Sequence, residues 1–237
     1  MSTVRHMHDP QTWPMYVSQK LKLDGMVPSR TKIAYAQSCH TGSVGQGNGL
    51  ISRHIIYQVD HALKTLAPEE LLVGMVWSGP SRFEFYQDPV NSEGNDFIVN
   101  VTGIQHNHWQ ILNHHWSDRY SETWYRNFYS HVGSLVTSYE HILRTQWFLQ
   151  QRNIKYFMSV INQEVMPADM HDHKEISHLH DMIDFTKWLP ISGVYEWALE
   201  QSGLPFAMHD LCHLTTAQNI KLTNEVIMPF LERMNYV

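Results

Sequence analysis

The stretch from Lys32 to Trp77 limits the possible fold more than any other part of the chain. Lys32 to Gln37 is a short, apolar-rich run that ends abruptly, and it predicts a buried strand. Leu50 to Leu66 repeats apolar residues at helical spacing, and Leu71 to Trp77 predicts a second buried strand. Because parallel strands are joined by crossover connections that usually contain a helix, this order is typical of a parallel sheet.

The remaining patterns extend this prediction along the chain. They predict a short strand or extended edge at Phe97–Val101, a long helix at Ser121–Asn153, a third buried strand at Ile154–Ile161, a short helix at Val194–Gln201 and a last helix at Thr215–Met234, where Pro229 marks a kink or an end. Ser78–Asn95 is interpreted as a long polar connection, and the sequence does not assign Gln105–Asp118. We expect an α/β protein with three layers, a mainly parallel sheet of about four or five strands flanked by helices.

Length and composition fit one domain and exclude several classes of partner. The chain has 237 residues and a net charge of −6, so nucleic acid is not the expected partner. We interpret residues 1–30 as an N-terminal arm packed on the domain, and residues 31–237 as a single α/β domain. Neither a signal peptide nor a transmembrane segment is predicted, and two cysteines imply no disulfide framework. We therefore expect a cytoplasmic protein of the producing or host cell, and the oligomeric state stays open.

Ser38 is the first candidate catalytic residue. It directly follows the first predicted strand, and open parallel sheets place their sites at the carboxyl ends of strands. The loop after it is rich in glycine and leads into a helix, so its backbone N–H groups can face an oxyanion.

Asp210 and His213 are the second part of the same hypothesis. They are three residues apart and come just before the last predicted helix, so a turn can present both side chains to one point. A Ser nucleophile, a His base and an Asp that orients the base form a catalytic triad. Ser38, His213 and Asp210 are the residue types that this mechanism needs.

The two blocks resemble the SGNH, or GDSL-like, hydrolase family. In that family the serine is followed four residues later by glycine, as in Ser38–Gly42, and the last block is Asp-x-x-His before a helix, as in Asp210–His213. Ser78–Arg82 and Thr145–Leu149 also look like phage-encoded relatives of the family. The resemblance implies a flavodoxin-like, three-layer fold and ester or acyl chemistry carried by Ser38, His213 and Asp210.

The chain departs from the family pattern around the oxyanion hole. Ala36-Gln37 stands where the family has Gly-Asp, and no Gly-x-Asn-Asp follows the second strand. The candidate oxyanion donors are Ser78, Gly79, Arg82 and Asn95, with the loop glycines Gly45, Gly47 and Gly49 as further candidates.

The expected function is therefore a serine-dependent esterase or acyltransferase that acts on an ester-bearing small molecule or glycan. The alternative is a catalytically inactive SGNH-like module that binds a ligand or belongs to a virion. If the triad assembles, Cys39 and Cys212 lie near each other, and Cys39 is then an alternative nucleophile.

Histidines suggest a competing metal site. His171, His173, His178 and His180 surround Asp172 and Glu175, and such residues bind zinc. No third ligand has the spacing of a known motif, so we expect neither a metal nor another cofactor.

Overall fold

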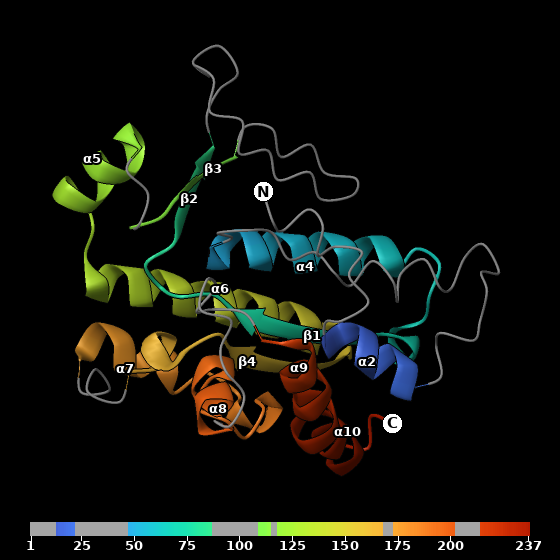
Figure 1. Cartoon of the computed structure of the whole chain (residues 1–237). Coiled ribbons are helices and arrows are strands. Elements are labelled where there is room, and N and C mark those ends of the chain that lie inside the picture. Colours follow the sequence, from blue (N-terminus) through green and yellow to red (C-terminus); the bar gives the residue numbers. More distant parts are fainter. Residues whose placement is uncertain (1–12, 22–46, 87–108, 115–117, 168–172, 202–213) are drawn as a thin grey trace.

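Two parallel strands lie at the centre of the structure, between two layers of helices (Figure 1). We describe residues 13–21, 47–86, 109–114, 118–167, 173–201 and 214–237 of a computed structural model of the chain. The central strands are β1 (Leu72–Trp77) and β4 (Lys155–Val160). One face of this pair is covered by α4 (Asn48–Ala62) and α6 (His131–Gln151), and the other by α2 (Trp13–Lys20), α8 (Val194–Glu200), α9 (Thr216–Leu222) and α10 (Met228–Arg233).

The sheet is shorter than the sequence pattern suggests. β1 and β4 pair in parallel from Leu72 opposite Lys155 to Trp77 opposite Val160, and Trp188 forms an isolated parallel bridge with Met158. The α/β class and the two strands are thus confirmed, but the described residues show a parallel pair rather than a sheet of four or five strands. The strands predicted at Lys32–Gln37 and Phe97–Val101 lie outside the described residues.

Large apolar side chains fill the core between the sheet and α4 and α6. Leu135, Tyr139 and Ile142 of α6 are fully buried against Trp77 and Met158 of the strands. The central strand β4 is buried along most of its length, as its continuous apolar sequence predicts. This layer also contacts α7 (Lys174–His180), which packs on α6 through the buried Ile176.

The opposite layer contains two features that the sequence did not predict. Trp13–Lys20, part of the predicted N-terminal arm, forms the helix α2, and Val17 is buried in the core. The predicted last helix is interrupted by a π-helical turn at Thr223–Ile227, in which the Met228 N–H donates to the Thr223 carbonyl. Pro229 follows this turn within α10, so the helix does not end at Pro229 but continues to Arg233.

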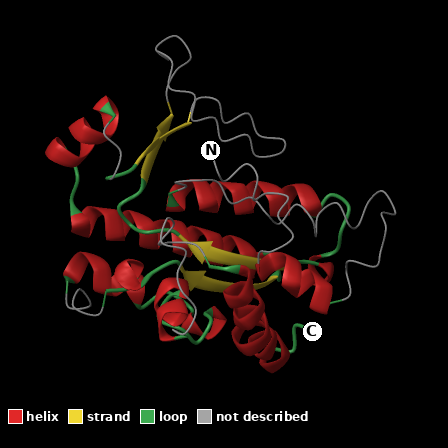
Figure 2. Cartoon of the chain, in the orientation of Figure 1, coloured by secondary structure: helices red, strands yellow, loops and turns green. Residues whose placement is uncertain are grey.

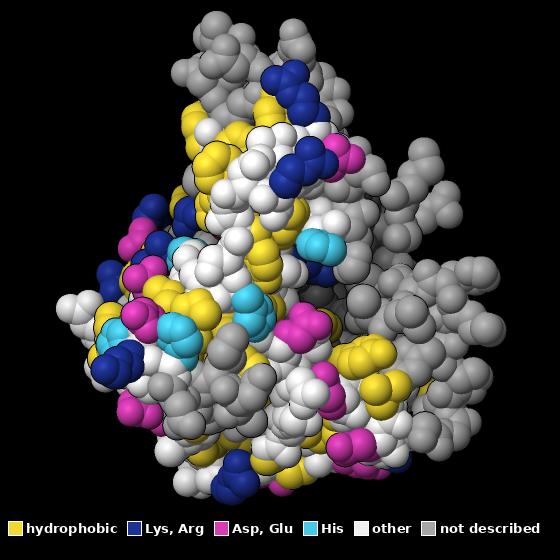
Figure 3. All heavy atoms as spheres, turned by 90° about the vertical axis from the view of Figure 1, so that its left-hand side faces the viewer, with side chains coloured by type: hydrophobic (Ala, Val, Ile, Leu, Met, Phe, Trp, Pro, Cys, Tyr) yellow, Lys and Arg dark blue, Asp and Glu magenta, His cyan; other side chains and the backbone are white. Residues whose placement is uncertain are grey.

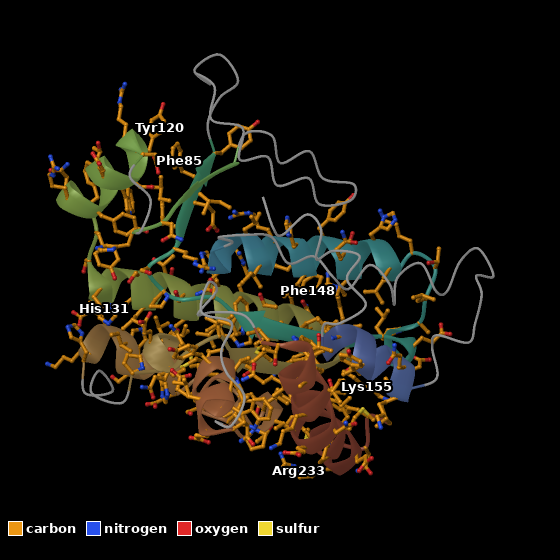
Figure 4. The ribbon with its side chains drawn as sticks, in the orientation of Figure 1. Phe85, Tyr120, His131, Phe148, Lys155 and Arg233 are labelled. Atoms are coloured by element: carbon orange, nitrogen blue, oxygen red, sulfur yellow. The ribbon has the colours of Figure 1, made fainter. Side chains whose placement is uncertain are left out.

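A small antiparallel hairpin stands apart from the main sheet (Figure 2). It consists of β2 (Phe83–Tyr86) and β3 (Trp109–Leu112), and α5 (Arg119–Asn127) packs against it. Phe83 stacks on Trp124 with ring centroids 4.1 Å apart. Phe85 and Tyr120 lie side by side in the same interface (Figure 4). We call β2, β3 and α5 the hairpin lobe. The sequence treated β2 as loop and left β3 unassigned.

The long helix predicted at Ser121–Asn153 is wrong, because it is two helices. Phe128–Ser130 separates α5 from α6, and each helix has its own N-cap: the Asp118 carboxylate accepts from the N–H groups of Tyr120 and Ser121, and the Ser130 hydroxyl accepts from Gly133. Apolar residues continue at helical spacing through the break, so periodicity alone joined the two helices. Across the described ranges, no helix combines the length and apolarity that a bilayer span requires.

Gly74 tests how tightly the central layer is packed. A Cβ at this position would overlap the ring of Phe157 and come within 3.0 Å of Trp13. We expect Gly74→Ala to lower the free energy of unfolding by about 1–3 kcal/mol, which urea denaturation measures. Gly79→Ala is the matched control, since the nearest atom to its Cβ would be 3.7 Å away. Equal stability of the two variants would contradict the tight contact at Gly74.

Candidate functional site

A pocket of about 500 Å³ opens between the hairpin lobe and the main body of the protein. The main body contributes the start of α4 and the first half of α6, and the lobe contributes β2 and the end of α5. Figure 3 shows the face that carries α5 and the start of α6, where His and basic side chains border a hollow. Pockets of this size between two structural parts are typical of small-molecule sites.

The pocket is connected to the carboxyl end of β1 through Asn48. The side-chain amide of Asn48 donates to the Ser78 carbonyl and to the Ser138 hydroxyl, both at 3.0 Å, and its oxygen accepts the Ser78 N–H at 2.8 Å. Asn48 is 3% exposed. All hydrogen-bonding atoms of this amide group are therefore used to fix the start of α4 beside the end of β1.

A carboxylate occupies the N-terminal turn of α4. The side chain of Glu84 is only 5% exposed, lies 3.2 Å from Arg53 and accepts the N–H of Leu50. Any Cβ at Gly47 or Gly49 would overlap the Glu84 carboxylate, so this contact requires glycine at both positions. The positive end of the helix is thus neutralised by the protein itself, and the Leu50 N–H is not available to an oxyanion.

Burial disfavours the charged forms of both Glu84 and Arg53. It raises the pKa of Glu84 above its ordinary value and lowers the pKa of Arg53, although each charge favours the other. Arg144, an exposed residue whose guanidinium Nε donates to Ser52 at 3.0 Å, adds a third charge to the group.

His141 is held in its neutral form. It lies over Gly49, where a Cβ would be 2.8 Å from its Nε2. Burial, together with the neighbouring charges of Arg144 and Arg53, lowers the pKa of His141 to about 4. At neutral pH the imidazole is therefore uncharged, and its unprotonated ring nitrogen can accept a hydrogen bond.

The low pKa of His141 predicts a stability change on acidification. The unfolded chain binds a proton at the ordinary pKa of 6.5, whereas the folded chain binds it only near 4, so stability falls as the pH drops between these values. We expect the free energy of unfolding in urea to decrease between about pH 6.5 and pH 4, and His141→Gln to reduce that decrease. His178→Gln, at an exposed histidine, is the control; an equal pH dependence in wild type and His141→Gln would contradict the assignment.

The sequence-predicted catalytic residues fall outside the described residues. These are Ser38, Asp210 and His213, together with the oxyanion candidate Asn95 and both cysteines, so the triad stays a prediction. The remaining oxyanion candidates are described. The Ser78 N–H is donated to Asn48, and the Ser78 hydroxyl accepts from Arg82 at 2.9 Å.

Gly79 retains a backbone donor at the end of β1. Gly79 is buried, and its N–H donates to no acceptor among the described residues. Of Ser78, Gly79 and Arg82, Gly79 therefore fits an oxyanion donor best, and Arg82, whose backbone N–H donates to the Gly79 carbonyl at 3.4 Å, lines the pocket.

The described histidines of the His-rich segment have separate partners. His173 lies 2.8 Å from the Glu175 carboxylate, His178 bonds to the Lys174 carbonyl at 3.0 Å, and His180 packs on Phe185. Within the described ranges, no group of three or more His, Cys, Asp and Glu residues forms a metal-binding cluster. His171 lies outside these ranges.

Sequence reasoning missed the charged group of the pocket. Arg53 and Glu84 are 31 positions apart and His141 lies much farther along the chain, so no local spacing relates them. Asn48 offered a signal, because a polar residue directly before an amphipathic helix often organises its N-terminus.

The fold and the pocket define an α/β protein with a candidate ligand site at the carboxyl end of its parallel strands. The sequence profile of a family of unknown function (DUF6071) matches residues 3–194. The chain therefore belongs to the DUF6071 family. No curated protein and no solved structure matches the chain.

Proposed function

We propose that the protein is a serine-dependent esterase or acyltransferase in which Ser38 attacks an acyl carbonyl. His213 takes the serine proton and Asp210 orients the imidazole. The acyl group then passes to water or to an acceptor alcohol or amine, and the same residues serve both outcomes. The observation that carries the proposal is the position of α4, whose start is tied to the carboxyl end of β1 only ten residues after Ser38.

Crossover geometry supports a position for the Ser38 strand. β4 pairs with one edge of β1, and no strand among the described residues pairs with the other edge. α4 and α6 cover the same face of the sheet. Because crossovers between parallel strands are almost always right-handed, connections on the same face advance in the same direction across the sheet. A strand at Lys32–Gln37 would therefore pair with the free edge of β1, and Ser38 would lie beside Ser78 and Gly79.

This arrangement differs from the flavodoxin-like order that the family resemblance implies. In that order the first strand lies between the second and the third. Here β1 and β4 are directly hydrogen-bonded, so the first strand would be at the edge of the sheet. The proposed fold is accordingly a three-layer α/β sheet related to SGNH hydrolases by its site rather than by its strand order.

The direction of the last helices supports the location of His213. The Lys155 ammonium donates to the Tyr236 carbonyl at 3.2 Å, so the end of the chain lies at the amino end of β4. α9 and α10 thus run away from the carboxyl edge, the edge of the sheet where Ser38 is expected.

Labelling with a fluorophosphonate probe tests the proposal. We expect wild type to be labelled, Ser38→Ala to lose the label and Cys39→Ala to keep it. Loss in Cys39→Ala alone would identify the neighbouring cysteine as the nucleophile. Absence of labelling in folded wild type would reject the triad and favour the non-catalytic binding module, which the internal use of the Leu50 and Ser78 N–H groups also favours.

A further inference from the structure

The pocket combines charge, aromatic rings and hydroxyl groups in separate walls. Among the described lining residues, Arg53 and Arg82 are basic, Glu84 is acidic and His141 is neutral, so these residues together carry one net positive charge. The whole chain carries −6. This excess of basic groups in the described lining, in a protein whose net charge is negative, favours an anionic ligand.

Aromatic rings form the wall contributed by the hairpin lobe. Trp124 stacks on Phe83 and also lies 5.7 Å from the ring of Phe128. Phe128 is 65% exposed although it is a large apolar side chain beside the pocket. Flat rings with one free face suit a ligand that is itself flat and partly apolar on one side, such as the C–H face of a sugar ring.

Hydroxyl groups form the facing wall on α6. The Ser134 hydroxyl donates to the His131 carbonyl at 2.8 Å, and the Thr137 hydroxyl donates to the Gly133 carbonyl at 2.9 Å. The proton of each hydroxyl is thus used within the helix, and its oxygen lone pairs remain able to accept. This wall is suited to ligand groups that donate hydrogen bonds, as sugar hydroxyls do.

We infer that the pocket binds an anionic sugar of one or two rings, with its acidic group near Arg82, one ring face on Phe128 and its hydroxyls on Ser134 and Thr137. The acidic group is a carboxylate or a phosphate, since both accept hydrogen bonds from arginine. That this sugar is the substrate or acceptor of the acyl reaction rests on the proposed function; the binding itself does not.

Calorimetric titration of the Ser38→Ala variant tests binding separately from catalysis. The three probes are the disaccharide of glucuronic acid and N-acetylglucosamine, N-acetylglucosamine 6-phosphate and neutral diacetylchitobiose. We expect at least one anionic probe to bind at least about tenfold more tightly than the neutral disaccharide, with an affinity that falls as salt is raised. The better of the two anionic probes identifies the acidic group.

Paired variants locate the site. Phe128→Ala should weaken binding roughly tenfold, whereas Trp147→Ala, at an aromatic residue that is 51% exposed outside the pocket, should not. Arg82→Gln should abolish most of the preference for the anionic probe, and Arg126→Gln, at an exposed arginine outside the pocket, should preserve it. Three results would each overturn the inference, whatever the labelling experiment shows. They are equal affinity for all three probes, no binding at millimolar concentration, and equal effects of the two substitutions in a pair.

Discussion

Glu84→Ala is expected to lower the free energy of unfolding by about 2–4 kcal/mol, measured by urea denaturation. The substitution leaves Arg53 beside Arg144 without the carboxylate between them, and it removes the acceptor of the Leu50 N–H at the start of α4. We place the value somewhat below the cost for a fully buried pair, because the Arg53 side chain is 32% exposed.

Further variants, including the single Arg53→Met, separate charge from shape in the same group. Glu84→Gln keeps the volume and an acceptor, so it should cost less than Glu84→Ala. The double variant Arg53→Met with Glu84→Gln should lower the free energy of unfolding by less than the sum of the two single variants. Each single variant leaves one charged residue of the pair without its partner, whereas the double variant removes both charges. Glu122→Ala, at an exposed glutamate of α5, is the control and should stay within about 0.5 kcal/mol of wild type. Additive effects of the two substitutions would show that Arg53 and Glu84 do not interact.

His213→Gln and Asp210→Asn are expected to slow fluorophosphonate labelling by about 10⁴-fold, if the proposed mechanism is correct. The first removes the base that takes the Ser38 proton, and the second leaves the imidazole without the group that orients it. The rate is measured by quenching the labelling reaction at increasing times.

Combined and control variants make this prediction specific to a triad. The double variant should be no slower than the slower single variant, since members of one catalytic unit are not additive. His178→Gln and Asp181→Asn, at exposed residues of and just after α7, should label at the wild-type rate. A loss of less than tenfold in both single variants would show that Ser38 is not activated by these two residues.

Segments with one consistent local pattern were predicted correctly. α4, β1 and β4 each have an apolar pattern of a single period, and their boundaries differ from prediction by only a few residues. The hairpin was missed because β2 has only four residues and its partner β3 follows after a long separation, so neither turn chemistry nor alternation identified the pair. The division between α5 and α6 depends on the caps Asp118 and Ser130, which periodicity does not detect.

Local sequence patterns reveal even less of the candidate site than of the fold. Ser38 and His213 were proposed from short motifs, whereas the charged group depends on side chains that only the fold brings together. Glu84 is the clearest case, because in sequence it is an ordinary polar residue of a connection and in the structure it is buried against the first turn of α4. Its signature in sequence is indirect: Gly47 and Gly49 are small because its carboxylate lies against them.

The π-helical turn at Thr223–Ile227 has a consequence for how the C-terminal segment can change in length. One additional residue in this turn rotates everything after it by about 100° relative to a continuous α-helix, and this rotation directs Phe230 and Leu231 into the core. Asn224 is exposed, so its side chain can be replaced freely. Its deletion would remove the extra residue, and a regular α-helix would then direct Phe230 and Leu231 toward the same side as the π-helical turn does. In this segment the chain can therefore lose one residue while the side chains that follow keep facing the core.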